Sequence, residues 1–364
     1  MKITDIKIAE CKLPLPRPIR LGPVEITTRD FVAVRVETDA GIWGDALGYP
    51  RGTALAKSLE KMSSTAIGRD TRDRRAVVDE FLQNFINGRA TFTKAASLLD
   101  IALWDIASKE IEQPVFRMLG AARTTVPVMV VAGYYLDQRS IEDVGQEVQA
   151  LVDEGYERIK VMILGNDLDF DLRFVEAMYK IAGPRLCVDA HWAWNSIDEA
   201  YYTCRRLDDL GLRFIEDPFG PYRAGQTHRL QSSLRTPTAC GEDAPDAVAL
   251  FELAQNTRIL RLDATTCGGI SSAIAVTEAT GLIGHTVLPH VFMPVHAQLA
   301  GAYKAIEAVE LIPEASGACP MYELLQRSAS ICSGALRIDE EPGAGLALDW
   351  SKVEKFSVKT YHCR

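Results

Sequence analysis

Residues 185–242 read RLCVDAHWAWNSIDEAYYTCRRLDDLGLRFIEDPFGPYRAGQTHRLQSSLRTPTACGE, and this stretch decides the fold. It contains three short apolar runs, RLCVD, LRFIE and PTACGE, and each run ends in an acidic residue. The ends lie at Asp189, Glu216 and Glu242, so they are 27 and 26 residues apart. Intervening segments such as SIDEAYYTCRRLDDL have the pattern of an amphipathic helix. Strands that alternate with helices predict parallel pairing, because neighbouring parallel strands need a crossover connection.

The same pattern extends on both sides of this stretch. Eight apolar runs occur at intervals of roughly two dozen residues: VPVMVVAGYY, YERIKVMI, RLCVD, LRFIE, PTACGE, RILRLD, TVLPH and AVELI. Helical segments lie between most of them. Eight such units predict a (β/α)8 barrel. A doubly wound sheet would favour a glycine-rich first turn, and neither G-x-G-x-x-G nor G-x-x-x-x-G-K-[ST] occurs.

The chain before and after these units has a different pattern. Val32, Val34 and Val36 recur at every second position before a Thr-Asp-Ala-Gly turn, which is typical of a hairpin. From Thr53 to Leu119 the apolar period is about 3.6 residues, which predicts helices. The final stretch, ALRIDEEPGAGLALDW, returns to strands and turns. We expect an α+β capping domain over residues 1–122, completed by about residues 335–364, and the barrel over residues 123–334.

Composition excludes several classes of function. The chain has 364 residues, of which 47% are hydrophobic and 24% charged, as in an ordinary globular protein. Its 40 basic and 49 acidic residues give a net charge of −9 without a basic stripe, so we expect neither a nucleic-acid nor a membrane partner. No apolar stretch reaches the roughly 18–20 residues of a membrane helix. Eight scattered cysteines without a C-x-x-C motif indicate a reduced, cytoplasmic protein.

The three acidic strand ends indicate a metal site. In a parallel barrel, Asp189, Glu216 and Glu242 would lie side by side at the C-terminal mouth, where barrel enzymes carry their chemistry. Their mutual repulsion requires a cation between them, and oxygen-only ligands favour Mg²⁺ or Mn²⁺. Each acid alone could instead cap a helix or pair with an arginine, but three in phase favour the metal.

Two further strand ends carry a candidate base. RILRLD ends at Asp263, and TVLPH ends at His290, 27 residues later. A carboxylate beside the imidazole would fix its tautomer and raise its basicity. Opposite a metal-bound substrate, we interpret His290 as a general base.

Three other residues share faces with these positions. Lys160 and Met162 are two apart on the second barrel strand and so point to the same side. Lys160 would add positive charge near a bound carboxylate, unless it extends to solvent as most lysines do. His191 follows Asp189 by two and could serve as a general acid or be a loop histidine among tryptophans.

Taken in order, these motifs resemble the enolase superfamily, and within it the mandelate racemase subgroup. ALWDIASKEIEQPVFRMLG resembles the last helix of that family's capping domain, and GYERIKVMI resembles its second-strand motif. VDAHWAWN, FIEDP, GED, LDATTCGGIS, LPHVFMP and the closing IDEEPGAGLALD follow in the family's order. The resemblance covers essentially the whole chain.

The resemblance implies that Asp189, Glu216 and Glu242 bind Mg²⁺ and that His290 acts with Asp263. Members of the superfamily use a lysine or histidine base while Mg²⁺ stabilises an ene-diolate. A proton next to a carboxylate is very weakly acidic, so a cation helped by Lys160 would stabilise the charge that its removal creates. The resemblance also implies a small-molecule carboxylate substrate and a homo-oligomer.

The chain departs from the racemase pattern at two positions. That pattern has K-x-K on the second strand, and here the second lysine, which acts as a base, is replaced by Met162. It also has D-x-N on the third strand, and here His191 replaces the asparagine, as in some sugar-acid dehydratases of the subgroup. One base and one acid favour β-elimination over racemisation.

We therefore predict a Mg²⁺-dependent dehydratase of an aldonate or aldarate. His290 would abstract the proton on C2, His191 would protonate the departing C3 hydroxyl, and the enol would become a 2-keto-3-deoxy acid. Arg20, Tyr49 and Arg51 are candidate substrate contacts in the capping domain. Two alternatives stay open: a racemase, epimerase or cycloisomerase of the same superfamily, and a non-catalytic carboxylate-binding barrel.

Overall fold

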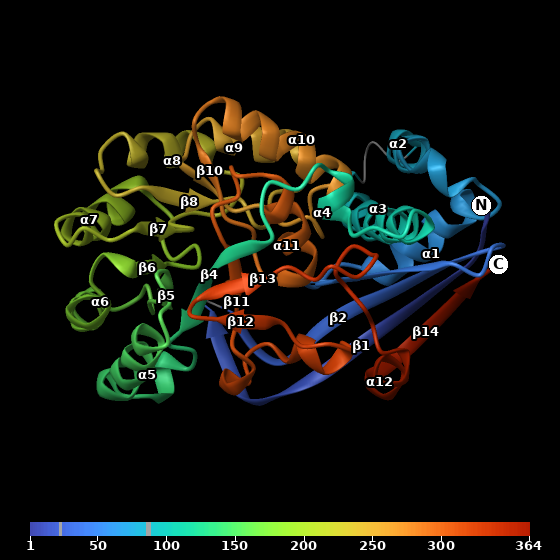
Figure 1. The fold of residues 1–364 in the computed structure, drawn as a ribbon. Coiled ribbons are helices and arrows are strands. Elements are labelled where there is room, and N and C mark those ends of the chain that lie inside the picture. The colour runs from blue at the N-terminus through green and yellow to red at the C-terminus, as the bar shows by residue number, and fades with distance from the viewer. Residues whose placement is uncertain (22–23, 85–88) are drawn as a thin grey trace.

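We describe the protein from a computed structural model, which covers residues 1–21, 24–84 and 89–364. Two parts lie side by side, a ring of strands and helices and a smaller part built on an antiparallel sheet (Figure 1). Both chain ends lie in the smaller part (Figure 1). Residues 22–23, and residues 85–88 of the stretch predicted to be helical, fall outside the described residues.

The smaller part, here called the cap, contains a four-stranded antiparallel sheet in the order β14-β1-β2-β3. Its strands are β1 (Ile3–Leu21), β2 (Val24–Thr38), β3 (Trp43–Gly48) and β14 (Ser357–Cys363). The expected hairpin joins β2 to β3, and Gly41 N–H donates to Thr38 O across its turn at 3.1 Å. The alternating valines of β2 are all buried, and Phe31 and Ala33, which point to the other face of the sheet, are buried too.

The helices α1 (Leu55–Ala66) and α3 (Arg89–Glu110) pack on this sheet. The helices α2 (Arg74–Asn84) and α4 (Val115–Met118) and the 3-10 turn η1 (Thr71–Asp73) pack against α3. The long helix α3 runs against β3 so closely that a Cβ on Gly44 would lie 2.0 Å from the carbonyl oxygen of Ala102. Only glycine permits this approach, which brings the cap helices onto the sheet.

The larger part is a closed barrel of parallel strands. They are β4 (Thr125–Ala132), β5 (Ile159–Met162), β6 (Leu186–Asp189), β7 (Phe214–Glu216), β8 (Thr238–Cys240), β9 (Ile259–Leu260), β10 (Thr286–Val287) and β11 (Val309–Leu311). Neighbours pair in chain order, β11 pairs with β4, and a parallel bridge between Val287 and Ile306 completes the ring. The eight apolar runs of the sequence thus correspond to the eight strands, and the predicted barrel with an α+β cap is confirmed.

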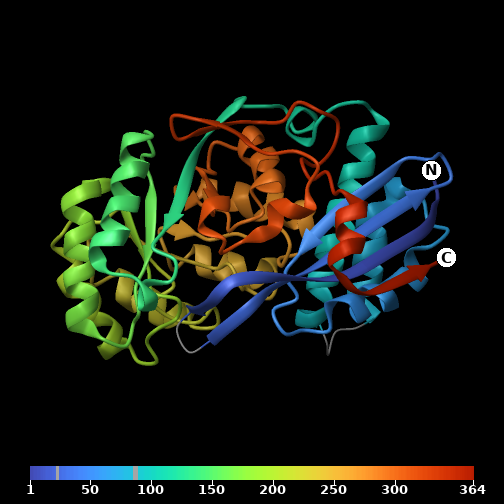
Figure 2. The same cartoon turned by 90° about the horizontal axis from the view of Figure 1, so that it is seen from below.

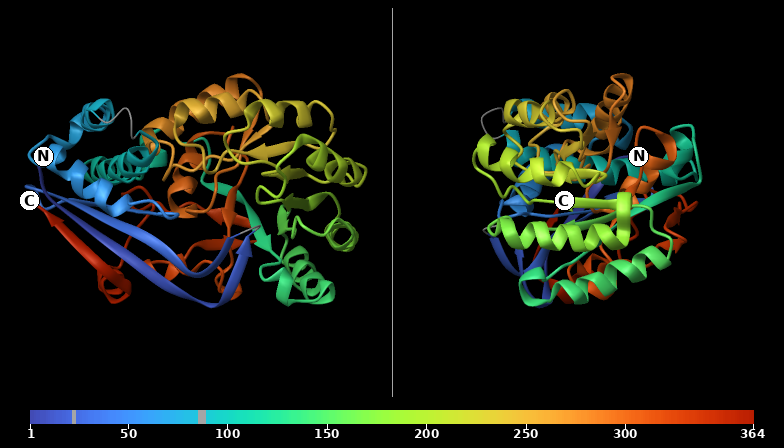
Figure 3. Two further views of the ribbon diagram at one scale, coloured as in Figure 1. Left: turned by 180° about the vertical axis from the view of Figure 1, so that it is seen from behind. Right: turned by 90° about the vertical axis from the view of Figure 1, so that its left-hand side faces the viewer.

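Helices pack outside the barrel, as the right panel of Figure 3 shows for several of them. They are α5 (Ile141–Asp153), α6 (Leu168–Ala182), α7 (Ile197–Asp208), α8 (Ala224–Gln231), α9 (Ala247–Ala254), α10 (Gly269–Leu282) and α11 (Met293–Ala302), with 3-10 turns η3 (Leu136–Gln138) and η4 (Gly183–Arg185). Ser140 and Ser196 begin α5 and α7 with capping boxes, in which the serine hydroxyl and an acidic side chain three residues on bond reciprocally.

The chain returns to the cap after β11. It forms η5 (Glu314–Ser316), η6 (Pro320–Leu324), β12 (Ser330–Cys332), β13 (Ala335–Arg337) and α12 (Trp350–Phe356) before β14. β13 pairs with barrel strand β4, whereas β14 pairs with β1 of the cap. The position of the boundary between cap and barrel stays a prediction.

Inward-facing side chains form layers inside the barrel. The deepest layer is apolar and contains Met129, Cys187, Phe214, Ala239, Ile259, Leu288 and Ala308. Because inward residues of a strand are two apart, the next layer toward the C-terminal ends begins two positions later. It is charged, and contains Asp189, Glu216, Arg261 and Glu310. The barrel therefore has an apolar floor beneath a charged layer.

The cap meets the barrel through α3 and α10. The Asp100 carboxylate on α3 accepts hydrogen bonds from the Ser271 N–H at 2.9 Å and the Ser271 hydroxyl at 2.7 Å, in the first turn of α10. Gly269 has φ +83°, and a Cβ there would lie 2.3 Å from Asp100 Oδ2. The glycine pair of LDATTCGGIS thus permits the contact that orients the cap.

The β1–β2 hairpin extends from the cap across one end of the barrel (Figure 2; Figure 3, left). Gln138 Nε2, after β4, donates to Pro18 O at 2.9 Å. Arg29 Nε donates to Ala318 O, after β11, at 2.8 Å. Since both barrel residues follow strands, the hairpin covers the C-terminal mouth beside β4 and β11.

Two expectations concern the whole chain. No helix in the described ranges combines the length and apolar character needed to cross a bilayer. The eight cysteines all lie within those ranges, and each is a free thiol there.

Candidate active site

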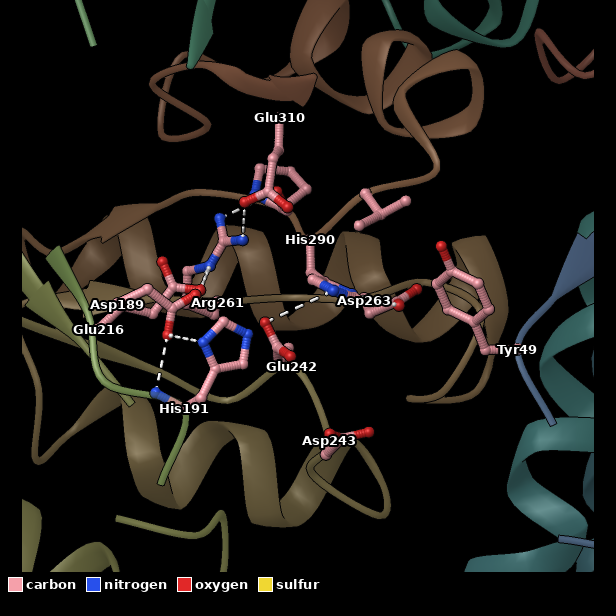
Figure 4. A network of polar contacts seen from close by, with 12 residues as sticks. Tyr49, Asp189, His191, Glu216, Glu242, Asp243, Arg261, Asp263, His290 and Glu310 are labelled. Atoms are coloured by element: carbon pink, nitrogen blue, oxygen red, sulfur yellow. Dashed lines mark hydrogen bonds and ion pairs between the residues drawn. The ribbon is translucent and has the colours of Figure 1, made fainter. Parts of the chain in front are cut away.

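The strand ends of β5 to β8 lie level with one another. Met162 is the register partner of Asp189, and Asp189 is the partner of Glu216. Glu242 follows two residues after the end of β8, at the same rim. Figure 4 shows the three acidic side chains together with Asp263 and His290, which follow β9 and β10. The predicted spacing therefore does bring the acids to one mouth.

The tightest carboxylate group contains one residue that the sequence did not single out. One oxygen each from Glu216, Asp217 and Glu242 lie within 4.8 Å of one another, and all three residues are buried. Strand alternation would turn Asp217 away from its neighbour, but its φ of +45° bends the chain as β7 ends. That bend could not be predicted from FIEDP alone.

Asp189 lies beside this group, and each of its carboxylate oxygens contacts a neighbouring residue. Its Oδ1 accepts the backbone N–H of His191 at 3.0 Å, and its Oδ2 is 3.0 Å from Lys160 Nζ. Two residues of the expected trio, Glu216 and Glu242, belong to the tightest group, whereas Asp189 lies beside it and Asp217 takes the third place. The role of Asp189 as a metal ligand stays a prediction.

The donors fit a hard divalent cation such as Mg²⁺. All are carboxylate oxygens, and Glu216 Oε2 is buried without a hydrogen-bond partner among the described residues. Burial raises the pKa of Glu216 to about 8, against the pull of Arg261 and Lys160. Burial, together with Glu242 and Glu216, raises the pKa of Asp217 well above its ordinary value. A bound cation would relieve both effects.

A buried ion network supports the group from below. Lys160 Nζ lies 2.9 Å from Glu216 Oε1, 3.0 Å from Asp189 Oδ2 and 3.0 Å from Glu310 Oε2. Arg261 Nε donates to Glu216 Oε1 at 2.9 Å, and its Nη2 contacts Glu310. Sequence reasoning missed Arg261 and Glu310, although each lies within an apolar run at an inward position.

Lys160 therefore does not extend to solvent. Burial would lower its pKa, but the three carboxylates outweigh burial and raise the pKa well above its ordinary value. The ammonium stays charged at neutral pH and is unavailable as a base. Met162, the next inward residue of β5, is also buried and cannot accept a proton.

His290 and Asp263 form the expected pair. His290 Nδ1 lies 3.0 Å from Asp263 Oδ2. Asp263 Oδ1 accepts two hydrogen bonds from Thr265, one from its N–H and one from its hydroxyl, both at 2.7 Å. Burial would raise the pKa of Asp263, but its bonds to His290 and Thr265 prevail and lower it. The carboxylate thus fixes Nδ1 as the protonated nitrogen and directs Nε2 toward the mouth.

His191 lies on the other side of the carboxylates. Its Nδ1 is 3.2 Å from Asp189 Oδ1, outside hydrogen-bond geometry, and its ring lies edge-on to Trp192 at 6.3 Å. Its φ of +45° turns the imidazole into the mouth. Burial lowers the pKa of His191. In Figure 4 the rings of His191 and His290 both lie beside Glu242.

Two of the three candidate cap residues reach this mouth. The Tyr49 ring centroid lies 6.5 Å from that of His290, and its hydroxyl is 3.1 Å from Cys319 Sγ. Arg51 Nη2 lies 3.3 Å from His290 Nε2 and 3.4 Å from Glu242 Oε1, while Nη1 contacts Asp243. The guanidinium of Arg51 thus joins the base to the carboxylate group.

Arg20 lies elsewhere on the hairpin. Its Nε is 3.0 Å from Glu25 and 3.7 Å from Asp137, and its side chain is 63% exposed. Neither partner belongs to the carboxylate group, so the structure gives no support for a substrate contact at Arg20.

The sequence matches two family models over most of its length. Residues 143–352 match the model described as enolase C-terminal domain-like, and residues 3–120 match the mandelate racemase / muconate lactonizing enzyme N-terminal domain. Together they cover most of the barrel and most of the cap.

Similar proteins catalyse several reactions. An arabinonate dehydratase of Saccharolobus solfataricus is 24% identical over 91% of each chain. A D-galactarolactone cycloisomerase of Agrobacterium fabrum is 26% identical over 98% of this chain and 99% of its own. The crystal structure of L-talarate dehydratase from Polaromonas sp. JS666, complexed with Mg and L-glucarate, superposes with a TM-score of 0.89 at 25% identity, covering 99% of this chain and 98% of that one.

Both domain matches and the closed barrel beneath an α+β cap lead to one assignment: the chain belongs to the mandelate racemase / muconate lactonizing enzyme family of the enolase superfamily.

Proposed function

We propose that this protein is a Mg²⁺-dependent dehydratase of a sugar acid. The observation that carries the proposal is the asymmetry of the mouth. One side has the His290–Asp263 pair, whereas β5 offers only an ion-paired ammonium and the thioether of Met162. One general base supports removal of a proton from one face, which suits elimination better than inversion through two opposed bases.

Different residues of the chain hold the metal and abstract the proton. Mg²⁺, held by Asp189, Glu216 and Glu242, would supply positive charge where the substrate carboxylate becomes a dianion. His290 Nε2 takes the proton from C2, and its Nδ1–H stays hydrogen-bonded to Asp263. The imidazolium formed is stabilised by that carboxylate.

His191 completes the elimination. His191 must enter this step as the imidazolium, the form that the neighbouring Asp189 carboxylate stabilises against the effect of burial. The C3–O bond breaks as this imidazolium donates its proton to the departing hydroxyl, which leaves as water, and His191 is left neutral. The remaining enol tautomerises to a 2-keto-3-deoxy acid. His191 comes from β6 and His290 from β10, so acid and base reach the substrate from different sides of the barrel.

The charged layer below excludes water and fixes the ligands. Lys160 and Arg261 both contact Glu216 Oε1 and leave its Oε2 free toward the mouth. Held in this way, Glu216 would meet the cation without reorganisation, which is the condition for effective electrostatic stabilisation.

Turnover of a panel of sugar acids tests the proposal. The protein is incubated with Mg²⁺ and aldonic or aldaric acids, and 2-keto acids are scored as semicarbazones. We expect at least one acid to react, and His290→Asn to lower kcat by about 10²–10⁴-fold. The matched control is His228→Asn, because His228 is an exposed histidine of α8. Turnover unaffected by His290→Asn would contradict the proposal.

An isomerase reaction is the second candidate, because the cycloisomerase of Agrobacterium fabrum is similar over nearly the full length. Reaction in D2O separates the two. Deuterium at the α-carbon with inversion and without 2-keto acid would favour the isomerase. Absence of Mg²⁺ binding in a calorimetric titration would favour a non-catalytic carboxylate-binding barrel.

The proposal includes the class of substrate, the oligomeric state and the location of the protein. A small carboxylate is the expected substrate, and the L-talarate dehydratase similar to this chain was crystallised with such a ligand. A homo-oligomer and a cytoplasmic location stay predictions.

A further inference from the structure

Arg29 of β2 carries a positive charge that forms no ion pair with a carboxylate among the described residues. Its Nε donates to Ala318 O at 2.8 Å, and its guanidinium lies 5.9 Å from the centre of the Tyr49 ring. Among the described residues, no carboxylate lies within ion-pair distance of it, and that is its one hydrogen bond. A guanidinium has five N–H donors, so most of its donors are free.

The groups that face Arg29 are uncharged or repulsive. They are the hydroxyls of Tyr49 and Tyr134, the thiol of Cys319 and the guanidinium of Arg51. Burial raises the pKa of both tyrosines, so neither hydroxyl ionises near neutral pH. Arg51, in contrast, contacts Glu242 and Asp243. Arg29 is half-buried. A partly desolvated cation without a counter-charge is unfavourable, so this position suits an anion that arrives from outside.

Arg29 lies at the same mouth as the candidate base. Tyr49 lies between them: its ring centre is 5.9 Å from the Arg29 guanidinium carbon and 6.5 Å from the His290 ring centre. Arg29 and His290 are thus no farther apart than the sum of these distances. Figure 4 shows Tyr49 on the cap side of His290. Ala318 follows β11 and Tyr134 follows β4, which places Arg29 above that part of the rim.

The direction of a bound substrate follows from the barrel interior. Below the carboxylate group, Lys160, Arg261 and Glu310 fill the barrel, and the apolar floor lies beneath them. A molecule whose carboxylate end is held by the acids can extend only toward the cap. Its far end would then approach the face of the cap from which Arg29 projects.

We propose that Arg29 binds a second carboxylate at the far end of the substrate, which makes the protein selective for sugar diacids over the corresponding monoacids. This rests on the proposed function and narrows its substrate class to the aldarates. Arginine suits the task because its planar fork binds a carboxylate through two parallel hydrogen bonds.

Lys94 of α3 is the competing cation. The charges that face it are Asp243, Asp263 and Arg51, and burial lowers its pKa. Two carboxylates already face Lys94, whereas none in the described part of the chain lies within ion-pair distance of Arg29, so Arg29 has the greater need of an external anion.

The test compares matched pairs of hexaric and hexonic acids, which differ only in having a carboxylate or a hydroxymethyl group at C6. Wild type, Arg29→Met, Arg29→Lys, Lys94→Met and Arg17→Met are assayed with Mg²⁺, and circular dichroism verifies folding. Arg17→Met is the matched control, because Arg17 is exposed on the same hairpin and lies 4.2 Å from the Tyr135 ring centre. Binding of each acid is measured in parallel by calorimetry with the His290→Asn protein.

We expect wild type to favour the diacid at least tenfold in kcat/KM, mainly through KM. Arg29→Met should lower this ratio at least tenfold, Arg29→Lys should restore part of it, and Arg17→Met should leave it unchanged. Equal kcat/KM for both acids in wild type, or loss of the ratio in Lys94→Met but not in Arg29→Met, would overturn the inference.

Calorimetry separates failure of the inference from failure of the proposed function. If no acid reacts but diacids bind and Arg29→Met weakens their binding, the dehydratase is wrong and the second-carboxylate site stands. If acids react without preference for diacids, the dehydratase stands and the role of Arg29 is wrong. If no acid reacts or binds, both are wrong.

Discussion

Replacement of Arg261 by methionine tests whether the charged layer stabilises the fold. Arg261 is fully buried. It donates to Glu216 Oε1 at 2.9 Å, to the carbonyl oxygens of Leu288 at 2.9 Å and Pro289 at 3.1 Å, and to Glu310. Methionine fills much of the same volume without any of these bonds, so Arg261→Met would leave two buried carboxylates short of a partner.

The expected loss can be worked from these contacts. Removal of one partner from a buried ion pair costs about 3–5 kcal/mol. Lys160 still lies 2.9 Å from Glu216 and 3.0 Å from Glu310, which places the loss near the lower end, at about 3 kcal/mol. The carbonyl groups of Leu288 and Pro289 would also lose their donor, which increases the expected loss of stability.

Guanidinium-induced unfolding, followed by tryptophan fluorescence at pH 7, measures this loss. The control is Arg258→Met, because Arg258 precedes the same strand and its guanidinium is exposed, with one bond to Arg235 O at 3.1 Å. Arg261→Lys keeps the charge but loses the planar fork, so it should be intermediate. If Arg261→Met lies within about 0.5 kcal/mol of the Arg258→Met control, the charged layer contributes nothing and the reasoning is refuted.

Three further predictions follow from the site and its supports. Asp263→Asn should lower kcat by about 10²–10⁴-fold with unchanged circular dichroism, because His290 loses the partner that fixes its tautomer; a kcat near wild type would contradict this. Burial raises the pKa of Asp100 from 3.8 to about 6, so the folded protein binds that proton more firmly than the unfolded chain. The stability of wild type relative to Asp100→Asn should therefore fall by about 2.4 kcal/mol as pH rises from 4 to 7, and a constant or rising difference in denaturant titrations would refute it. Mg²⁺ at 100 times its dissociation constant should stabilise the protein by about 2.7 kcal/mol, and Glu216→Gln should abolish this shift in thermal denaturation; an equal shift in both proteins would count against the ligand role.

The barrel was predictable because its signals are local and repeat. Each parallel strand is buried on both faces, so it appears as a short apolar run, and each run ends where a helix must begin. Asp189, Glu216 and Glu242 mark three such ends, and the structure brings all three to one mouth. The resemblance to the enolase superfamily is confirmed by the family models.

The buried charges were harder to predict from the sequence. Arg261 and Glu310 lie within apolar runs, where an isolated charge is usually read as a surface residue. The available signal was spacing: Arg261 precedes Asp263 by two residues and so shares its face. Asp217 gave no such signal, because its position depends on a backbone φ of +45°. Arg29 likewise depends on where the hairpin lies, which is set by contacts with residues far along the chain.

Arg51 and Arg20 were both candidate substrate contacts in the cap, and the structure places them differently. Arg51 reaches the base and a carboxylate of the group, whereas Arg20 pairs with Glu25 and Asp137 on the hairpin side. Sequence cannot distinguish two loop arginines, since their reach depends on how the cap sits over the barrel. The roles of both residues toward substrate stay predictions.

The central claim is that carboxylates at this mouth hold one divalent ion against which an α-proton becomes removable. The most direct measurement is anomalous scattering from crystals soaked in Mn²⁺, which occupies the same kind of oxygen site as Mg²⁺. The account predicts a single peak at about 2.1 Å from oxygens of Asp189, Glu216 and Glu242. No peak at saturating Mn²⁺, with Glu216 Oε2 still unpartnered, would contradict it.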